Sequence, residues 1–203
     1  RSPTVTGVQT CALPISYAPD REAHSLRGAL AKAFALPSEC FLVGTTAPYM
    51  IRSVAQTFEP CGVGVALPCP AEHLLAIENA GHTIEPIVNP HSFVTPDARF
   101  VEDAGARIRA ALLSNPGYPA SRLLPKQTLL SYLEQCDWVV VDERSIELTL
   151  GGESMRGLVM EHRNLVIVQS FCEQYAMPGT PVSYCVAPPT RSEERRVGKE
   201  CRS

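Results

Sequence analysis

The chain has 203 residues, of which 45% are hydrophobic and 19% charged, and its formal net charge at pH 7 is −3. This composition is typical of a globular protein, and the length is sufficient for one domain with a hydrophobic core. The acidic balance argues against nucleic acid or an anionic membrane as a partner. No apolar run approaches the length of a membrane span.

The two ends of the chain differ from the rest. Residues 5–16 and 191–203 resemble translated sequencing-adapter DNA, so we predict that residues 1–16 and 191–203 are artefactual and disordered. The alternative is a pair of natural polar tails. Residues 17–190 are then the biological domain, with 12 basic and 18 acidic side chains and a formal charge of −6.

Helices and strands alternate along this domain. Hydrophobic spacing predicts helices over 20–36, 50–58, 70–80, 125–136 and 154–161, and strands over 41–43, 62–67, 83–88, 109–114, 138–141, 165–168 and 182–187. Residues 89–103 are weakly patterned and are expected to form a loop with some helix. Alternation of this kind favours right-handed crossovers and an α/β fold with a mostly parallel sheet.

Cysteines and histidines give no sign of a metal site. Six cysteines fall within residues 17–190, without a Cys-x-x-Cys pair, so we expect reduced thiols and a cytoplasmic protein. No signal segment is recognisable. Metal-ligand spacing is likewise missing among the histidines, which are His24, His73, His82, His91 and His162.

The most informative stretch runs from residue 164 to residue 187. A short apolar run predicts a strand buried on both faces, a polar turn follows over 170–174, and a second strand closes the stretch. In α/β sheets, the turn that follows such a strand commonly builds a ligand site.

The stretch contains Ser170, Phe171, Tyr175, Gly179 and Tyr184. With these residues it resembles the lysine segment of the pyridoxal-phosphate-dependent aminotransferases of fold type I, of the histidinol-phosphate aminotransferase and threonine-phosphate decarboxylase type. Two further motifs, Asn-Pro-x-x-Pro at 115–119 and Val-Val-Val-Asp-Glu at 139–143, follow in the family order. The resemblance covers nearly all of residues 17–187. It implies a three-layer sandwich, the large domain of the fold, with the C-terminal small domain missing.

The same resemblance implies pyridoxal phosphate as cofactor and names candidate binding residues. Asp142 stands where the family places the partner of the pyridine nitrogen, and Ser170 where a hydroxyl contacts the phosphate. Thr46 and Ala47 stand in the family's phosphate-binding turn. As alternatives, Asp142 is a helix cap or a turn former, and Ser170 is an ordinary turn serine.

Other positions depart from the family. Glu173 occupies the position of the Schiff-base lysine, and Pro181 that of the phosphate-binding arginine. Glutamate cannot form an imine, and its charge disfavours a nearby phosphate. Further departures are Pro48 for a hydroxyl, Glu72 for the stacking aromatic, Tyr118 for an asparagine and Ser145 for a tyrosine. Tyr118 is expected to pack at the strand end, and the alternative is that its ring stacks on the cofactor from a new direction.

No catalytic residue is therefore predicted. Apart from the adapter-like end, the only lysines are Lys32 and Lys126, and both fall on helices as expected surface residues. The preferred hypothesis is a degenerate, catalytically inactive domain that forms a homodimer or pairs with a related chain.

Two alternatives remain open. The first is an active pyridoxal-phosphate-dependent aminotransferase or decarboxylase, acting on an amino acid or an amino-acid phosphate. The second is a decayed gene fragment without function.

Overall fold

The computed structural model describes residues 20–89, 95, 98, 108–177 and 179–189. Both adapter-like ends, and most of the predicted loop over 89–103, lie outside the described residues. Seven strands form one sheet: β1 (Phe41–Gly44), β2 (Gly62–Ala66), β3 (Thr83–Ile87), β4 (Ile108–Ser114), β5 (Trp138–Asp142), β6 (Leu165–Ser170) and β7 (Ser183–Val186). The helices are α1 (His24–Phe34), α2 (Ala47–Ala55), α3 (Ala71–Glu78), α5 (Lys126–Gln135) and α6 (Phe171–Gln174), with 3₁₀ turns η1 (Ser38–Cys40), η3 (Ile146–Leu148) and η4 (Met155–Met160).

The sheet is mostly parallel, as predicted. Its strand order is β1-β7-β6-β5-β4-β2-β3, and β7 is antiparallel to both of its neighbours. The remaining pairs, β2 with β3 and β4, β4 with β5, and β5 with β6, are all parallel. The carboxyl ends of the six co-directional strands therefore lie along one edge of the sheet.

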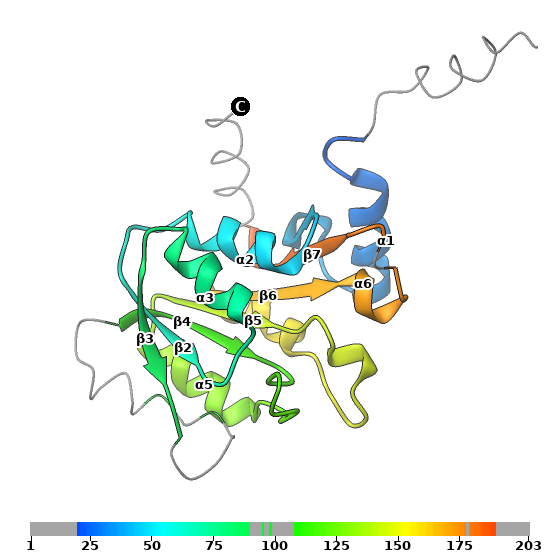
Figure 1. Cartoon of the computed structure of the whole chain (residues 1–203). Helices are drawn as coiled ribbons and strands as arrows, with labels where there is room; N and C mark the ends of the chain where they lie inside the picture. Colours follow the sequence, from blue (N-terminus) through cyan, green and yellow to red (C-terminus); the bar gives the residue numbers. More distant parts are fainter. Residues whose placement is uncertain (1–19, 90–94, 96–97, 99–107, 178, 190–203) are drawn as a thin grey trace, which may run out of the picture.

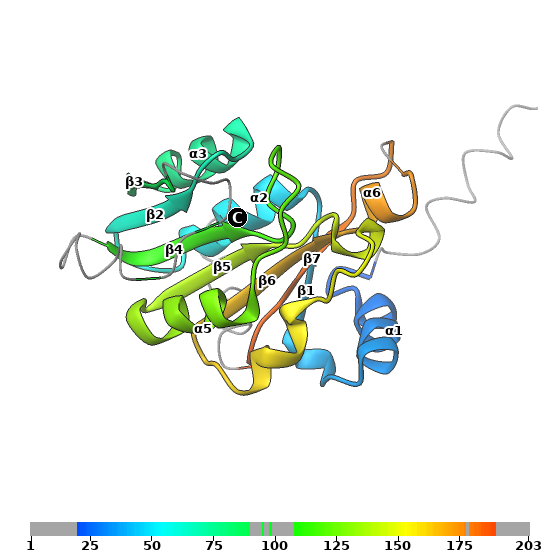
Figure 2. The same ribbon diagram turned by 90° about the horizontal axis from the view of Figure 1, so that it is seen from below.

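Helices cover both faces of the sheet and make a three-layer α/β sandwich (Figure 1). On one face, α2 and α3 bury apolar side chains such as Ile51 and Ile77 against the sheet. On the opposite face, α1, α5 and η4 contribute Leu30, Leu129 and Val159 (Figure 2). Strand β6 is buried at every position, because it lies between these two layers.

Three local predictions need correction. The predicted polar turn over 170–174 contains the four-residue helix α6, with Ser170 as its N-cap. The predicted helix over 154–161 is the 3₁₀ turn η4. The third correction concerns helix ends: the helices predicted over 20–36, 50–58 and 70–80 are α1 (His24–Phe34), α2 (Ala47–Ala55) and α3 (Ala71–Glu78).

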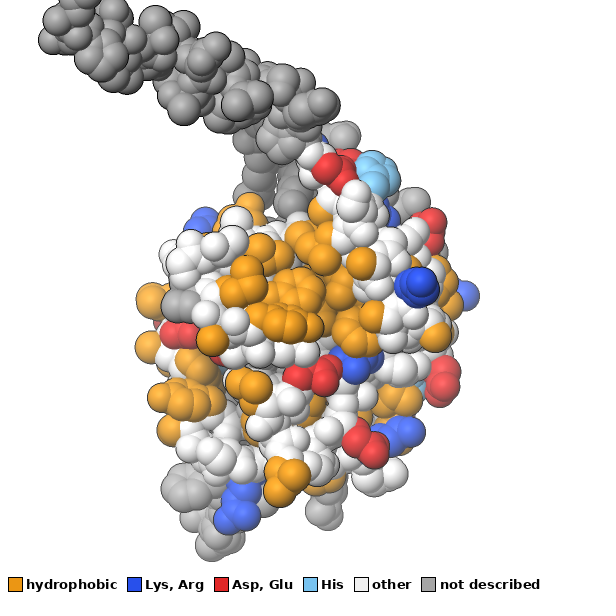
Figure 3. Space-filling view, turned by 90° about the vertical axis from the view of Figure 1, so that its right-hand side faces the viewer, with side chains coloured by type: hydrophobic (Ala, Val, Ile, Leu, Met, Phe, Trp, Pro, Cys, Tyr) orange, Lys and Arg blue, Asp and Glu red, His pale blue; other side chains and the backbone are white. Residues whose placement is uncertain are grey.

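Apolar side chains gather on the end of the molecule where α1 and α6 lie (Figure 3). Tyr175 and Met177, which directly follow α6, are 60% and 39% exposed. A contiguous apolar patch on a protein surface commonly marks an interaction site. In the described part of the chain, no helix is long and apolar enough to cross a membrane.

Candidate functional site

A cavity of about 820 Å³ opens at the carboxyl edge of the sheet. Its walls come from the segments that follow β2, β4, β5 and β6, where open α/β sheets usually bind their ligands. It is lined by Pro70, Ala71, Glu72, Ser114, Pro116, Gly117, Tyr118, Ser121, Asp142, Arg144, Ser145, Leu148, Thr149, Leu150 and Glu173.

Asp142 lies at the floor of this cavity, as the last residue of β5. Its neighbours in the sheet are Ser114 of β4 and Val168 of β6. The side chain is only 5% exposed, and its Oδ2 accepts a hydrogen bond from His73 Nε2 at 2.7 Å. The predicted place of Asp142, at the end of a buried strand, is therefore confirmed.

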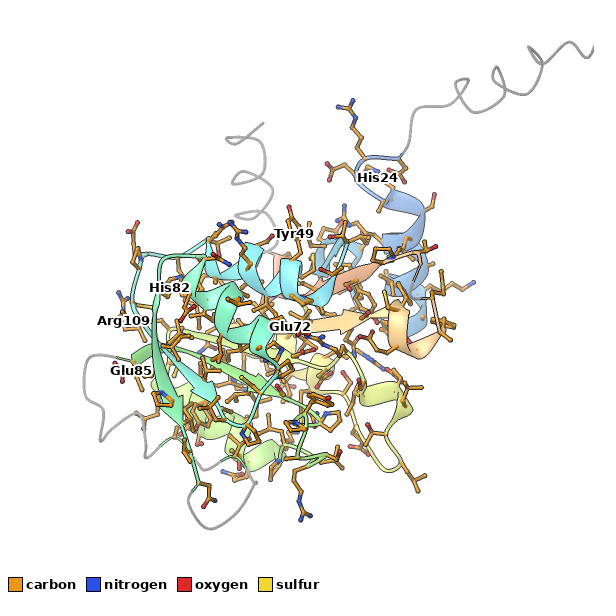
Figure 4. All side chains as sticks on the ribbon, viewed as in Figure 1. His24, Tyr49, Glu72, His82, Glu85 and Arg109 are labelled. Atoms are coloured by element: carbon orange, nitrogen blue, oxygen red, sulfur yellow. The ribbon has the colours of Figure 1, made fainter. Side chains whose placement is uncertain are left out.

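Arg144 closes over the same carboxylate. Its Nε donates to Asp142 Oδ2 at 2.8 Å, and its backbone N–H donates to Oδ1 at 3.0 Å. Its Nη1 reaches Glu72 Oε1 at 2.9 Å. Glu72 lies in the first turn of α3, near the centre of the view in Figure 4. Both oxygens of Asp142 are thus engaged by the protein itself.

These contacts decide the charge of Asp142. Burial opposes ionisation, but the hydrogen bond from His73 and the charge of Arg144 outweigh it and hold the pKa of Asp142 below its ordinary value. Burial also disfavours the charged guanidinium, yet Asp142 and Glu72 raise the pKa of Arg144. The floor of the cavity therefore holds a charged pair across the physiological pH range.

Glu173 contributes a further carboxylate to the cavity, separate from the cluster of Asp142, Arg144 and Glu72. It belongs to α6, and its Oε2 is buried with no hydrogen-bond partner in the described part of the chain. None of the described residues that line the cavity is a lysine. Lys32 on α1 and Lys126 at the start of α5 are exposed, as predicted.

The other candidate residues are not among those that line the cavity. Thr46 caps α2, and its Oγ1 accepts a hydrogen bond from the Tyr49 backbone. Ala47 is the first residue of α2 and is buried. Ser170 is 4% exposed, and its Oγ accepts from the backbone N–H of Cys172 at 3.1 Å. These three residues therefore lie outside the lining to which Asp142 and Glu173 belong.

Four of the departures from the family pattern line the cavity: Glu72 and Glu173, described above, and also Tyr118 and Ser145. Tyr118 is 66% exposed on its wall, so the expectation that this ring packs at the strand end was wrong. It lies in the turn that follows β4. Ser145 also lines the cavity, whereas Pro181 is exposed and does not belong to the lining.

A buried polar network holds the wall that follows β5. Glu143 is 1% exposed, and its carboxylate accepts hydrogen bonds from Asn115, Ser154, the Met155 backbone and Gln169. Burial raises the pKa of Glu143, and these hydrogen bonds only partly oppose the rise. Through Glu143, the network joins the start of η4 to Gln169 of β6, and this restrains the segment between β5 and η4 that forms the cavity wall.

His73 and Arg144 were not predicted as site residues. His73 lies on α3 and Arg144 in the loop that follows β5, and neither residue belongs to a recognisable sequence motif. Their contacts with Asp142 arise from the fold. A signal for Arg144 exists in the sequence, because a cation two residues after a buried acid can fold back on that acid.

The chain is similar to known aminotransferases in sequence. It is 28% identical over 176 residues to the chloroplastic histidinol-phosphate aminotransferase of Nicotiana plumbaginifolia, a match that covers 84% of this chain and 42% of the relative. It is 25% identical over 175 residues to the Thermococcus kodakarensis enzyme of the same name, covering 86% and 51%. The chain thus spans about half the length of these curated relatives. No family model matches it.

Solved structures agree with this relationship at the level of the fold. The L-threonine-O-3-phosphate decarboxylase of Porphyromonas gingivalis matches with a TM-score of 0.77 and 24% identity, over 93% of this chain and 57% of that one. The histidinol-phosphate aminotransferase of Clostridium acetobutylicum matches with a TM-score of 0.79 and 16% identity, over 91% and 56%. The resemblance predicted from the sequence, and the large-domain fold, are therefore confirmed.

Proposed function

We propose that this relative of the pyridoxal-phosphate-dependent aminotransferases of fold type I keeps the scaffold of its large domain without the Schiff-base chemistry. The observation that carries the proposal is Glu173. It lines the cavity at the position where the family resemblance expects the lysine, and a carboxylate cannot form an imine.

The residues at the cavity do not fit the cofactor well. Pyridoxal phosphate requires an amine, an acid at the pyridine nitrogen and donors for its phosphate. Among the described residues that line the cavity, only the acid, Asp142, has a counterpart, and its oxygens are occupied by His73 and Arg144. Near the phosphate position implied by the resemblance, Pro48 has no backbone N–H and Pro181 has no charge.

The proposal is tested by reduction with borohydride in the presence of stoichiometric pyridoxal phosphate, followed by intact mass and the visible spectrum. We expect no gain of one reduced cofactor and no saturable absorbance band. The variant Glu173→Lys serves as the positive control, because it restores an amine at the cavity. A stoichiometric adduct on a lysine of the unmodified protein would instead support an active aminotransferase or decarboxylase.

We further propose that the domain acts through association, as a homodimer or with a related chain, in the cytoplasm. The apolar surface around α6, with Tyr175 and Met177 exposed, supports association (Figure 3). The described cysteines are all free thiols, which suits a reducing compartment.

Sedimentation velocity over a range of concentrations tests the dimer. A monomer at every concentration contradicts self-association, and aggregation from the outset favours a decayed fragment.

A further inference from the structure

The cavity carries more negative than positive charge. Three of its described lining residues are carboxylates, Glu72, Asp142 and Glu173, and one is a guanidinium, Arg144. The guanidinium of Arg144 is already paired, because it forms ion pairs with Asp142 at 2.8 Å and with Glu72 at 2.9 Å. An anionic group that enters the cavity therefore meets no free cation among these lining residues.

Among the three described lining carboxylates, Glu173 is the one that does not pair with Arg144. Its Oε2 atom is buried and accepts no hydrogen bond from any described residue. A buried polar atom without a partner is unfavourable, and for a carboxylate oxygen the missing partner is a donor. Since Glu173 lines the cavity, a rotation of its carboxylate would bring this oxygen to a ligand there that supplies the donor.

The walls of the same cavity are largely apolar. Pro70 and Pro116 line it, and the side chains of Tyr118 and Leu150 stand 66% and 101% exposed. A ligand body that covers them removes apolar area from water. The exposed ring of Tyr118 also offers an aromatic face, which attracts organic cations.

We propose that this cavity binds a small organic cation, a primary amine on an apolar or aromatic body, with its ammonium group donating to Glu173. The inference rests on the proposed function, because it requires that Glu173 faces a ligand other than a Schiff-base cofactor. The charge preference of the cavity is then opposite to that needed by a phosphate-bearing cofactor.

Three probes of one shape and different charge test the proposal. These are 2-phenylethylamine, 2-phenylethanol and phenylacetate, titrated into the full chain at pH 7 and followed by calorimetry or by nuclear magnetic resonance shifts. We expect the amine to bind at least about tenfold more tightly than the alcohol, and the carboxylate to bind most weakly. Equal affinities, no binding of the amine or a preference for the carboxylate would overturn the proposal.

Variants locate the charge that makes the selection. Glu173→Gln should lower the affinity for 2-phenylethylamine about tenfold and leave the affinity for 2-phenylethanol unchanged. Glu85→Gln is the matched control, because Glu85 lies on the edge strand β3, far from Glu72 in Figure 4, and is not part of the lining. An equal loss in both variants contradicts the assignment of Glu173. The comparison of probes on the unmodified protein needs no variant to fold.

The failure of this inference can be distinguished from the failure of the proposed function. A covalent adduct with pyridoxal phosphate, trapped by borohydride reduction, overturns both the proposed function and the cation site. Without an adduct, the absence of a preference for the amine overturns only the cation site and leaves the loss of Schiff-base chemistry standing.

Discussion

His73 Nε2 and Asp142 Oδ2 lie 2.7 Å apart, and both side chains are almost completely buried. Because an ionised carboxylate has no proton, the imidazole is the donor in this contact. Arg144 approaches the same oxygen from the cavity side. A ligand that needs the carboxylate of Asp142 must therefore displace partners that the protein itself supplies.

Replacement of His73 by alanine should lower the free energy of unfolding by about 3 kcal/mol, because it leaves a buried charge with one partner fewer. Urea unfolding followed by circular dichroism measures this change. His24→Ala is the matched control, since His24 forms an exposed pair with Asp20 at 3.2 Å and its loss should lower the free energy of unfolding far less. Equal losses in the two variants would show that the buried pair of His73 and Asp142 stabilises the protein no more than an exposed pair does.

Asp142 should make the protein sensitive to acid. Its pKa in the folded state is lower than its unfolded value of 3.8, so the unfolded chain takes up the proton first as the pH falls. The stability that Asp142 contributes is fully present above pH 3.8 and is lost as the pH falls through the folded pKa. Urea midpoints measured from pH 6 down to pH 2.5 should show this decline, and Asp142→Asn should show less of it. A variant with the same acid decline as the parent protein contradicts the role of Asp142.

Much of the fold could be predicted from the sequence. Buried β-branched runs such as Val139–Val141, ended by turn residues, locate the strands without tertiary information. The antiparallel β7 could not be derived in this way, because the direction of a strand depends on how the chain returns to the sheet. The difference between a turn and α6 was also out of reach, since four residues carry no helical period.

The candidate site was predictable only in part. Asp142 follows from its place at the end of a buried strand, and Glu173 from its place in the lysine segment. His73 is 69 residues away from Asp142 in sequence, so its contact depends on how α3 packs over β5. Ser170 matches the family pattern, and its hydroxyl accepts a hydrogen bond from the Cys172 backbone as the N-cap of α6, a local role that the family pattern does not predict.

Glu143 should have the opposite pH effect from Asp142. Burial raises its pKa above the ordinary value of 4.5, so between 4.5 and the raised value the folded protein binds more protons than the unfolded chain. Stability from this group is therefore greatest at low pH and falls as the pH rises through that window. Glu143→Gln should flatten the dependence of the free energy of unfolding on pH above 4.5. Glu134→Gln, at an exposed position of α5, is the control and should leave this pH dependence unchanged. If the pH dependence persists in Glu143→Gln, a group other than Glu143 causes it.

Arg156 should hold the cavity wall in place. Its Nη1 lies 2.6 Å from Glu147 Oε1 in η3 and 3.3 Å from Gln169 Oε1 in β6, and its guanidinium carbon lies 3.9 Å from the centroid of the Phe34 ring. Arg156→Ala removes all three contacts, each of which restrains the segment between β5 and η4.

Since partly buried ion-pair and cation–π contacts together contribute about 1 kcal/mol, the backbone amides of Ile146–Leu148 should exchange with deuterium about fivefold faster in this variant. Arg52→Ala, at an exposed position of α2, is the control and should leave these amides unchanged. Faster exchange throughout the protein would mean that Arg156 supports global stability. Faster exchange confined to η3 would mean that it positions the wall that Leu148 and Thr149 present to the cavity.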